Sequence, residues 1–187
     1  FLAATAAVLL VGVNAWLGAR VVLSGLKPGI ITLHMALAVL LQCVLVYTAW
    51  RGTLEPWRLT WKSSPDTRLR GTAWLLFILV VVEGIMGSQV RELTDELARS
   101  HAGHSRADWV HELEVSWVYL IHRSFSWLIL GAALSFFVRS GRALMHRGWL
   151  ETSVTGIVLA QMLLGVVLAN VGILAIAQVL HIGLSSL

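Results

Sequence analysis

Long apolar runs alternate with polar connections along this chain of 187 residues. A helix that crosses a bilayer needs about 20 mostly apolar residues. Six runs meet or approach this length, and they cover residues 1–17, 30–50, 71–90, 115–138, 149–169 and 173–187, of which the last is short. The pattern therefore predicts an all-α protein, a polytopic membrane helical bundle with about six visible transmembrane helices.

The composition is typical of a membrane protein, which is surrounded by lipid rather than water. Hydrophobic residues make up 57% of it, charged residues only 13%, and the mean hydropathy is +0.78. Soluble domains usually carry about a quarter charged residues. The net charge of +4 is better explained by its distribution over the connections than by nucleic-acid binding, so we expect no nucleic-acid partner. The single cysteine, Cys43, lies in an apolar run. Because the sequence has one cysteine, no intrachain disulfide can form.

The cations of the connections favour one orientation in the membrane. Eight lie on one side, in the connections 51–70 and 139–148, and five lie on the other, namely Arg20, Lys27, Arg91, Arg99 and Arg106. Because cytoplasmic connections carry the excess of Lys and Arg, both visible termini are expected in the cytoplasm, at a bacterial cytoplasmic (inner) membrane. The outer connection 91–114 is polar and too long for a simple link, so we expect it to cover something.

An internal repeat links the beginning and the end of the chain. Residues 17–40 align without gaps to residues 164–187, so that Gly18 meets Gly165 and His34 meets His181, with sixteen positions from each glycine to its histidine. A related segment lies at the end of the third predicted helix. In each of the three segments a polar residue stands four positions before a glycine, and these polar residues are Asn14, Glu83 and Gln161. The unit is a helix pair, and the chain shows three pairs.

Each pair contributes one histidine to the membrane interior. His34, His122 and His181 follow the outer entry of their helices by about six to nine residues, or roughly 10–13 Å at the helical rise. Intramembrane ionisable residues need a partner or a function. Neutral imidazole is a common ligand of haem iron, and facing helices of a bundle can supply both axial positions. Interior histidines that bond to neighbouring carbonyls are the alternative interpretation.

Other polar residues have weaker claims to a function. Glu83 is interpreted as a polar contact between helices rather than a proton carrier, because its repeat counterparts are amides. The outer histidines His101, His104 and His111 match no strong zinc pattern. Three arginines near the outer ends of the histidine-bearing region are candidate partners of haem propionates, with interface anchoring as the alternative; they are Arg20, Arg91 and Arg123.

Several phrases resemble the haem A synthase family. The segment 119–127, Tyr-Leu-Ile-His-Arg-Ser-Phe-Ser-Trp, is similar to the His-Arg phrase of the family's sixth helix, and 87–92, Gly-Ser-Gln-Val-Arg-Glu, resembles the end of its fifth. The segment 178–181, Gln-Val-Leu-His, is similar to the histidine segment of the last helix. Residues 23–28, followed by His34, resemble the junction of the third and fourth helices. The resemblance covers nearly the whole chain.

The resemblance implies eight helices in two pseudo-symmetric halves, of which this chain lacks the first two helices. Residues 1–66 would be the second helix pair of the N-terminal half with a cytoplasmic connection, and residues 67–187 a C-terminal four-helix half that binds haem b. His122 and His181 would be its iron ligands, with Arg91 and Arg123 beside it. His34 would face the iron of the substrate haem, with Arg20 nearby.

The activity that the resemblance implies is oxidation of the C8 methyl of haem o to the formyl of haem a by successive hydroxylation. The resemblance carries over no catalytic residue. In the family, a Glu stands three residues before the other substrate-side histidine, in the first two helices that this chain lacks. At the equivalent point of the second half, three residues before His122, this chain has Tyr119. The alternative function is a cytochrome b-type subunit that transfers electrons without oxidising a substrate. A transporter is disfavoured because Pro28 lies in a turn. The enzyme that produces haem o and a second copy of the chain are candidate partners.

Overall fold

The computed structural model describes residues 1–25, 28–54, 58–62, 64–146, 148–171 and 175–185. Within these ranges the chain is helical apart from its connections and one isolated β-bridge. The helices are α1 (Leu2–Leu23), α2 (Pro28–Gly52), α3 (Thr67–Ser100), α4 (Arg106–Glu114), α5 (Trp117–Ala143), α6 (Trp149–Asn170) and α7 (Ala175–Ser185). Five of them, α1, α2, α3, α5 and α6, are long and apolar enough to cross a membrane. The predicted all-α membrane bundle is confirmed, and the chain is an integral membrane protein.

The chain forms two compact units, which are described separately. One unit contains residues 1–58 and 85–114, and the other contains residues 59–84 and 115–187. The helix α3 contributes its first half to the second unit and its second half to the first. The predicted division into 1–66 and 67–187 follows the helix repeat instead, and it stays a prediction.

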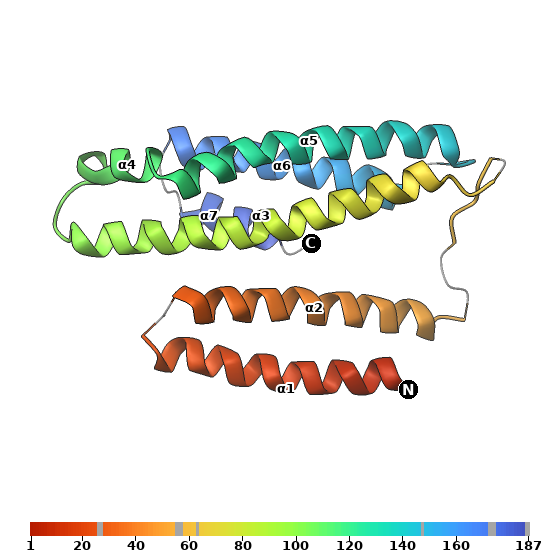
Figure 1. The fold of residues 1–187 in the computed structure, drawn as a ribbon, viewed down its shortest axis with the longest axis horizontal. Coiled ribbons are helices and arrows are strands. Elements are labelled where there is room, and N and C mark those ends of the chain that lie inside the picture. The colour runs from red at the N-terminus through yellow and green to blue at the C-terminus, as the bar shows by residue number, and fades with distance from the viewer. Residues whose placement is uncertain (26–27, 55–57, 63, 147, 172–174, 186–187) are drawn as a thin grey trace. The chain divides into compact units, whose positions relative to one another are not determined.

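In the first unit, α1 and α2 form an antiparallel hairpin whose helices lie side by side (Figure 1). The turn after α1 includes Gly25 in a left-handed conformation, with φ 70°, which glycine adopts without a steric penalty. Many large apolar side chains of the hairpin are exposed, among them Leu9, Leu33 and Val46. Such a surface is expected where lipid replaces water as the solvent.

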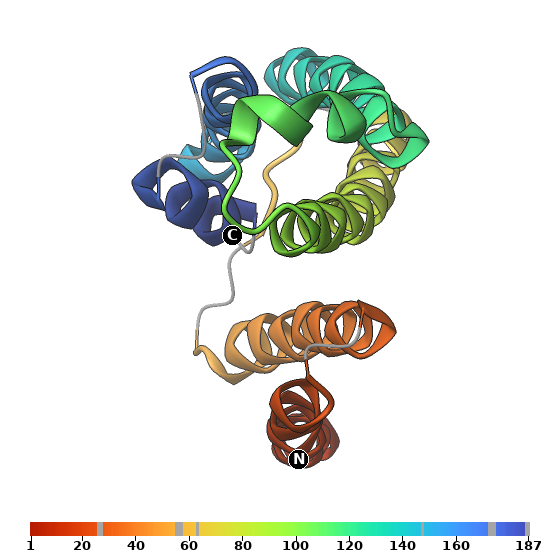
Figure 2. The same ribbon diagram turned by 90° about the vertical axis from the view of Figure 1, so that its left-hand side faces the viewer.

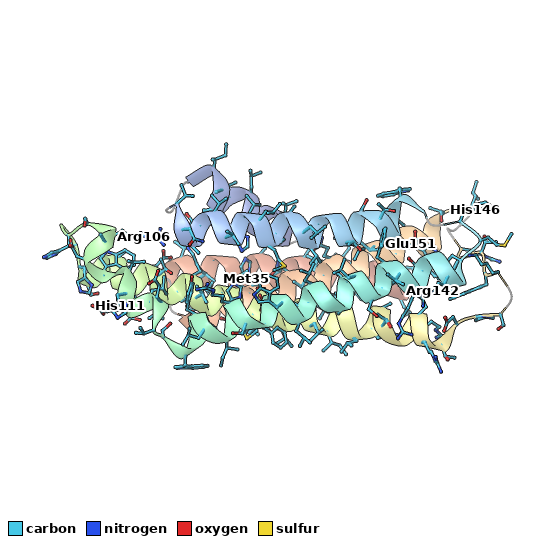
Figure 3. The ribbon with its side chains drawn as sticks, turned by 90° about the horizontal axis from the view of Figure 1, so that it is seen from above. Met35, Arg106, His111, Arg142, His146 and Glu151 are labelled. Atoms are coloured by element: carbon cyan, nitrogen blue, oxygen red, sulfur yellow. The ribbon has the colours of Figure 1, made fainter. Side chains whose placement is uncertain are left out.

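The second unit is built from the first half of α3 with α5, α6 and α7 (Figure 2). Its core joins Leu76 and Leu79 of α3 to Ile129 and Ala133 of α5, where Ala133 has no exposed surface. The connection before α3 is fixed to the end of α5, because the Lys62 amide donates to the Ala143 carbonyl at 3.0 Å. Figure 3 shows Arg142, His146 and Glu151 at this same end of the unit.

The outer segment is more helical than the sequence indicated. The third apolar run was predicted to end near residue 90, but α3 continues to Ser100, and α4 follows after a short turn. The extension is rich in good helix formers, and Arg91 pairs with Asp95 one turn later at 3.1 Å. Trp109 and Leu113 of α4 are only 5% and 4% exposed, so this helix packs its apolar side chains against the protein. That the outer connection covers a site stays a prediction.

Some residues that the sequence-based expectations involve lie next to, or outside, the part of the chain that the structure describes. The last predicted helix is observed as α7, whose eleven residues are fewer than the roughly 20 that span a bilayer. The neighbouring residues 172–174 and 186–187 lie outside the described residues. Gly172 of the repeat is among these residues. Lys27 and Arg147, which entered the comparison of charges, also lie outside the described residues.

Candidate functional site

The three membrane histidines occupy matching places in their helices. His34 is the seventh residue of α2, His122 the sixth of α5, and His181 the seventh of α7. All three are half-buried. His34 belongs to the first unit, whereas His122 and His181 both belong to the second. The helix-pair repeat therefore has a structural counterpart in the position of each imidazole.

Glycines of the preceding helices make room for two of these rings. A Cβ added to Gly18 would lie 3.1 Å from Cε1 of His34, and one added to Gly165 would lie 3.6 Å from Cε1 of His181. The spacing of sixteen residues between glycine and histidine thus has a physical cause. It places a residue without a side chain on α1 or α6 directly against the imidazole of the next helix.

In the second unit, His122 lies against a buried carboxylate. Its Nδ1 is 3.2 Å from Glu83 Oε1, and the two side chains are 21% and 16% exposed. The Ser126 hydroxyl donates to the same Oε1 at 2.6 Å, and also approaches the His122 carbonyl at 3.0 Å. Glu83 is a polar contact between α3 and α5, as interpreted from its repeat counterparts. That contact includes one of the candidate haem ligands.

His181 has an amide where His122 has a carboxylate. The Gln161 Nε2 donates to the backbone carbonyl of His181 at 2.9 Å. His122 of α5 and His181 of α7 both belong to the second unit. The second unit therefore contains the two histidines that the sequence predicts as a ligand pair.

Each helix pair contains buried polar atoms that lack a hydrogen-bond partner in the part of the chain that the structure describes. They include Nδ1 of His34, His122 and His181, and one side-chain oxygen each of Asn14, Glu83 and Gln161. Nδ1 of His122 approaches Glu83 at ion-pair distance without hydrogen-bond geometry. Buried polar atoms without partners cost free energy, so they are usually satisfied by something. The unpartnered ring atoms are Nδ1, while Nε2 is the atom that would ligate haem iron; three half-buried imidazoles at matching places in their helices fit that role.

The candidate propionate partners lie on the surface. Arg20 and Arg123 are exposed, and Arg123 directly follows His122. Arg91 forms an ion pair with Asp95 in which both side chains are 47% exposed. Arg20 shares a unit with His34, while Arg91 belongs to the other unit from His122 and His181. Their role toward propionates stays a prediction.

The outer histidines make local contacts. His101 Nε2 lies 3.3 Å from Glu112 Oε1, which joins the turn after α3 to α4, and His101 and His104 are in ring contact. Among the residues that the structure describes, no three His, Cys, Asp or Glu side chains are placed to hold a metal ion.

Sequence reasoning missed two polar arrangements. Ser126 received no role, although it stands one helical turn after His122 and so on the same face. In the first unit, the Thr32 hydroxyl lies 3.3 Å from the Ser88 hydroxyl and 3.4 Å from Glu92 Oε1, and accepts from Gln89 Nε2 at 3.2 Å. Their separation of almost sixty residues left no signal in the sequence.

The model of the family described as cytochrome oxidase assembly protein matches residues 1–187, which is the whole chain. No curated protein and no solved structure gives a significant match.

Proposed function

This chain belongs to the cytochrome oxidase assembly protein family, the family of haem A synthases, and we propose that it oxidises haem o to haem a. The reaction is oxidation of the C8 methyl of haem o to a formyl by successive hydroxylation. The observation that carries the proposal is the pair His122 and His181, which belong to one unit and stand near the start of α5 and of α7, at matching places in the two helices.

In this proposal the second unit is the electron-transfer half. His122 of α5 and His181 of α7 would hold haem b. When bound, haem b supplies a one-electron carrier. Gly165 leaves room for the His181 ring, and the core between α3 and α5 fixes the backbone that presents His122.

The first unit would bind the substrate haem. His34 would face its iron, with the ring held against Gly18 of α1, and Arg20 would meet a propionate of the substrate. Thr32 stands two residues before His34 and bonds to residues of α3. These contacts would fix the rotation of α2 about its axis and so the direction of the imidazole.

The setting of the proposed reaction is a bacterial cytoplasmic (inner) membrane with both visible termini in the cytoplasm. Lipid would surround the exposed apolar faces, and haem o would arrive from the enzyme that produces it, either by transfer between the two proteins or through the bilayer. A homo-oligomer is compatible with this arrangement.

The test is conversion of haem o by the chain. The protein is produced together with a haem o-producing enzyme in cells that lack their own haem A synthase, and the extracted haems are separated by chromatography. Haem a, or haem o with a hydroxylated methyl, is the expected product. Haem b bound to the purified protein with haem o unchanged would instead favour the electron-transfer cytochrome.

A further inference from the structure

We propose that Glu83 is a positioning residue that orients His122 and strengthens it as an iron ligand, and that this makes the two axial ligands of haem b unequal. The inference rests on the proposed function, because it assumes that His122 and His181 hold haem b. It concerns how one side chain of this protein acts on a ligand, and Glu83 would not touch the haem.

The unmet bonding capacities of the two side chains are complementary. Nδ1 of His122 and Oε2 of Glu83 are both buried and both lack a hydrogen-bond partner among the residues that the structure describes. The two groups already approach to 3.2 Å through Oε1. A rotation of the imidazole that points Nδ1–H at the carboxylate would give Nδ1 its missing partner.

Ser126 holds the carboxylate in position. Its hydroxyl donates to Glu83 Oε1 at 2.6 Å, a short bond of the kind that charged acceptors form. The hydroxyl also lies 3.0 Å from the carbonyl of His122, one turn earlier in α5. Nδ1 of His122 approaches the same oxygen, and a carboxylate oxygen has two lone pairs with which to accept from both groups.

A carboxylate that accepts Nδ1–H fixes the tautomer of the imidazole and raises the basicity of Nε2. The lone pair of Nε2 is then the one offered to a metal. A more basic axial ligand stabilises ferric over ferrous iron, so a haem held this way has a lower reduction potential than one held by two plain imidazoles.

His181 provides the contrast within the same unit. The repeat counterpart of Glu83 is Gln161, whose amide nitrogen donates to the backbone carbonyl of His181 at 2.9 Å. Nδ1 of His181 has no hydrogen-bond partner among the described residues, and Gln161 brings no negative charge to it. The asymmetry between the two ligands therefore comes from one difference in the repeat, Glu against Gln.

The experiment is a redox titration of haem in the purified full chain, comparing wild type with Glu83→Gln. The matched control is Glu151→Gln. Glu151 is also buried, at 4% exposure, and also has an oxygen without a partner, but it stands in the first turn of α6. It lies at the same end of the unit as Arg142, twenty residues and about 30 Å along α5 from His122 (Figure 3).

The expected result is that Glu83→Gln retains haem with a raised midpoint potential, while Glu151→Gln titrates as wild type does. Retained haem with an unchanged potential in Glu83→Gln would overturn the inference, as would equal shifts in both variants. If Glu83→Gln binds no haem, Ser126→Ala decides. A midpoint potential of Ser126→Ala above that of wild type, by less than is expected for Glu83→Gln, supports the positioning role. A midpoint potential of Ser126→Ala equal to that of wild type overturns it. Wild-type protein without haem would instead refute the proposed function.

Discussion

At the residue scale, the claim that His122 and His181 are iron ligands makes a direct prediction. Replacing either by alanine removes an axial ligand, so His122→Ala and His181→Ala should each abolish the stable haem signal of the purified protein. The control is His101→Ala, which loses contacts to Glu112, His104 and its own helix end in the outer segment. Equal haem loading in all three variants would contradict the assignment.

The glycines beside the imidazoles give a second prediction, with opposite outcomes at equivalent positions. A Cβ on Gly18 meets His34 at 3.1 Å, so Gly18→Ala must displace the ring, at about 1–3 kcal/mol for overpacking. A Cβ on Gly165 meets His181 at 3.6 Å, an ordinary contact, and the helix gains roughly 0.5–1 kcal/mol when glycine becomes alanine.

Thermal unfolding in detergent separates the two variants. The midpoint should fall for Gly18→Ala and stay equal or rise for Gly165→Ala. If both variants lower it alike, the close approach of Gly18 to His34 does not constrain the packing.

The residues of the candidate site could be predicted only in part. The spacing of Gly18 and His34 and its repetition at Gly165 and His181 indicated which histidines belong together, since a repeat preserves both distance and direction. The contact between Glu83 and His122 could not be predicted, because it depends on the rotation of α3 against α5. No periodicity within either helix records that angle.

At the scale of elements, the hydroxyl of Thr32 is the centre of the polar contacts between α2 and α3. It lies within hydrogen-bond distance of Ser88, Gln89 and Glu92. Thr32→Val keeps the shape of the side chain but leaves the buried Ser88 and the half-buried Glu92 with fewer partners, at about 1–3 kcal/mol.

The control for this prediction is Thr48→Val in the same helix, because the Thr48 hydroxyl bonds only to the Val44 carbonyl of its own α2. Chemical denaturation of the detergent-solubilised protein should show a loss of stability for Thr32→Val that clearly exceeds that of Thr48→Val. Equal losses would mean that the contacts to α3 do not stabilise the first unit.

The lengths of the elements show where hydropathy is informative and where it is not. It located α1, α2, α5 and α6, because lipid demands long apolar runs. It ended the third helix ten residues early, since Arg91 and Asp95 are polar yet form a pair that stabilises helix outside the apolar region. Helical structure continues wherever propensity and side-chain pairs support it, with or without apolar residues.

At the scale of the whole molecule, the distribution of cations predicts that the turn between α3 and α4 faces outward and the connection before α3 faces the cytoplasm. Single cysteines test this in a Cys43→Ala background. Ala102→Cys and Ser64→Cys place thiols at two exposed positions, one in each connection. A membrane-impermeant maleimide added to intact cells should label only Ala102→Cys, and both after lysis. The reverse pattern would invert the orientation.

The account depends most on haem held within the second unit, and an optical spectrum of the detergent-purified protein tests this directly. A reduced-minus-oxidised difference spectrum, with pyridine extraction to identify the haem type, should show haem b, with haem o or haem a in addition where the pathway supplies them. A spectrum without any haem would contradict the account. His34, His122 and His181 would then be interior histidines whose partners are neighbouring polar groups.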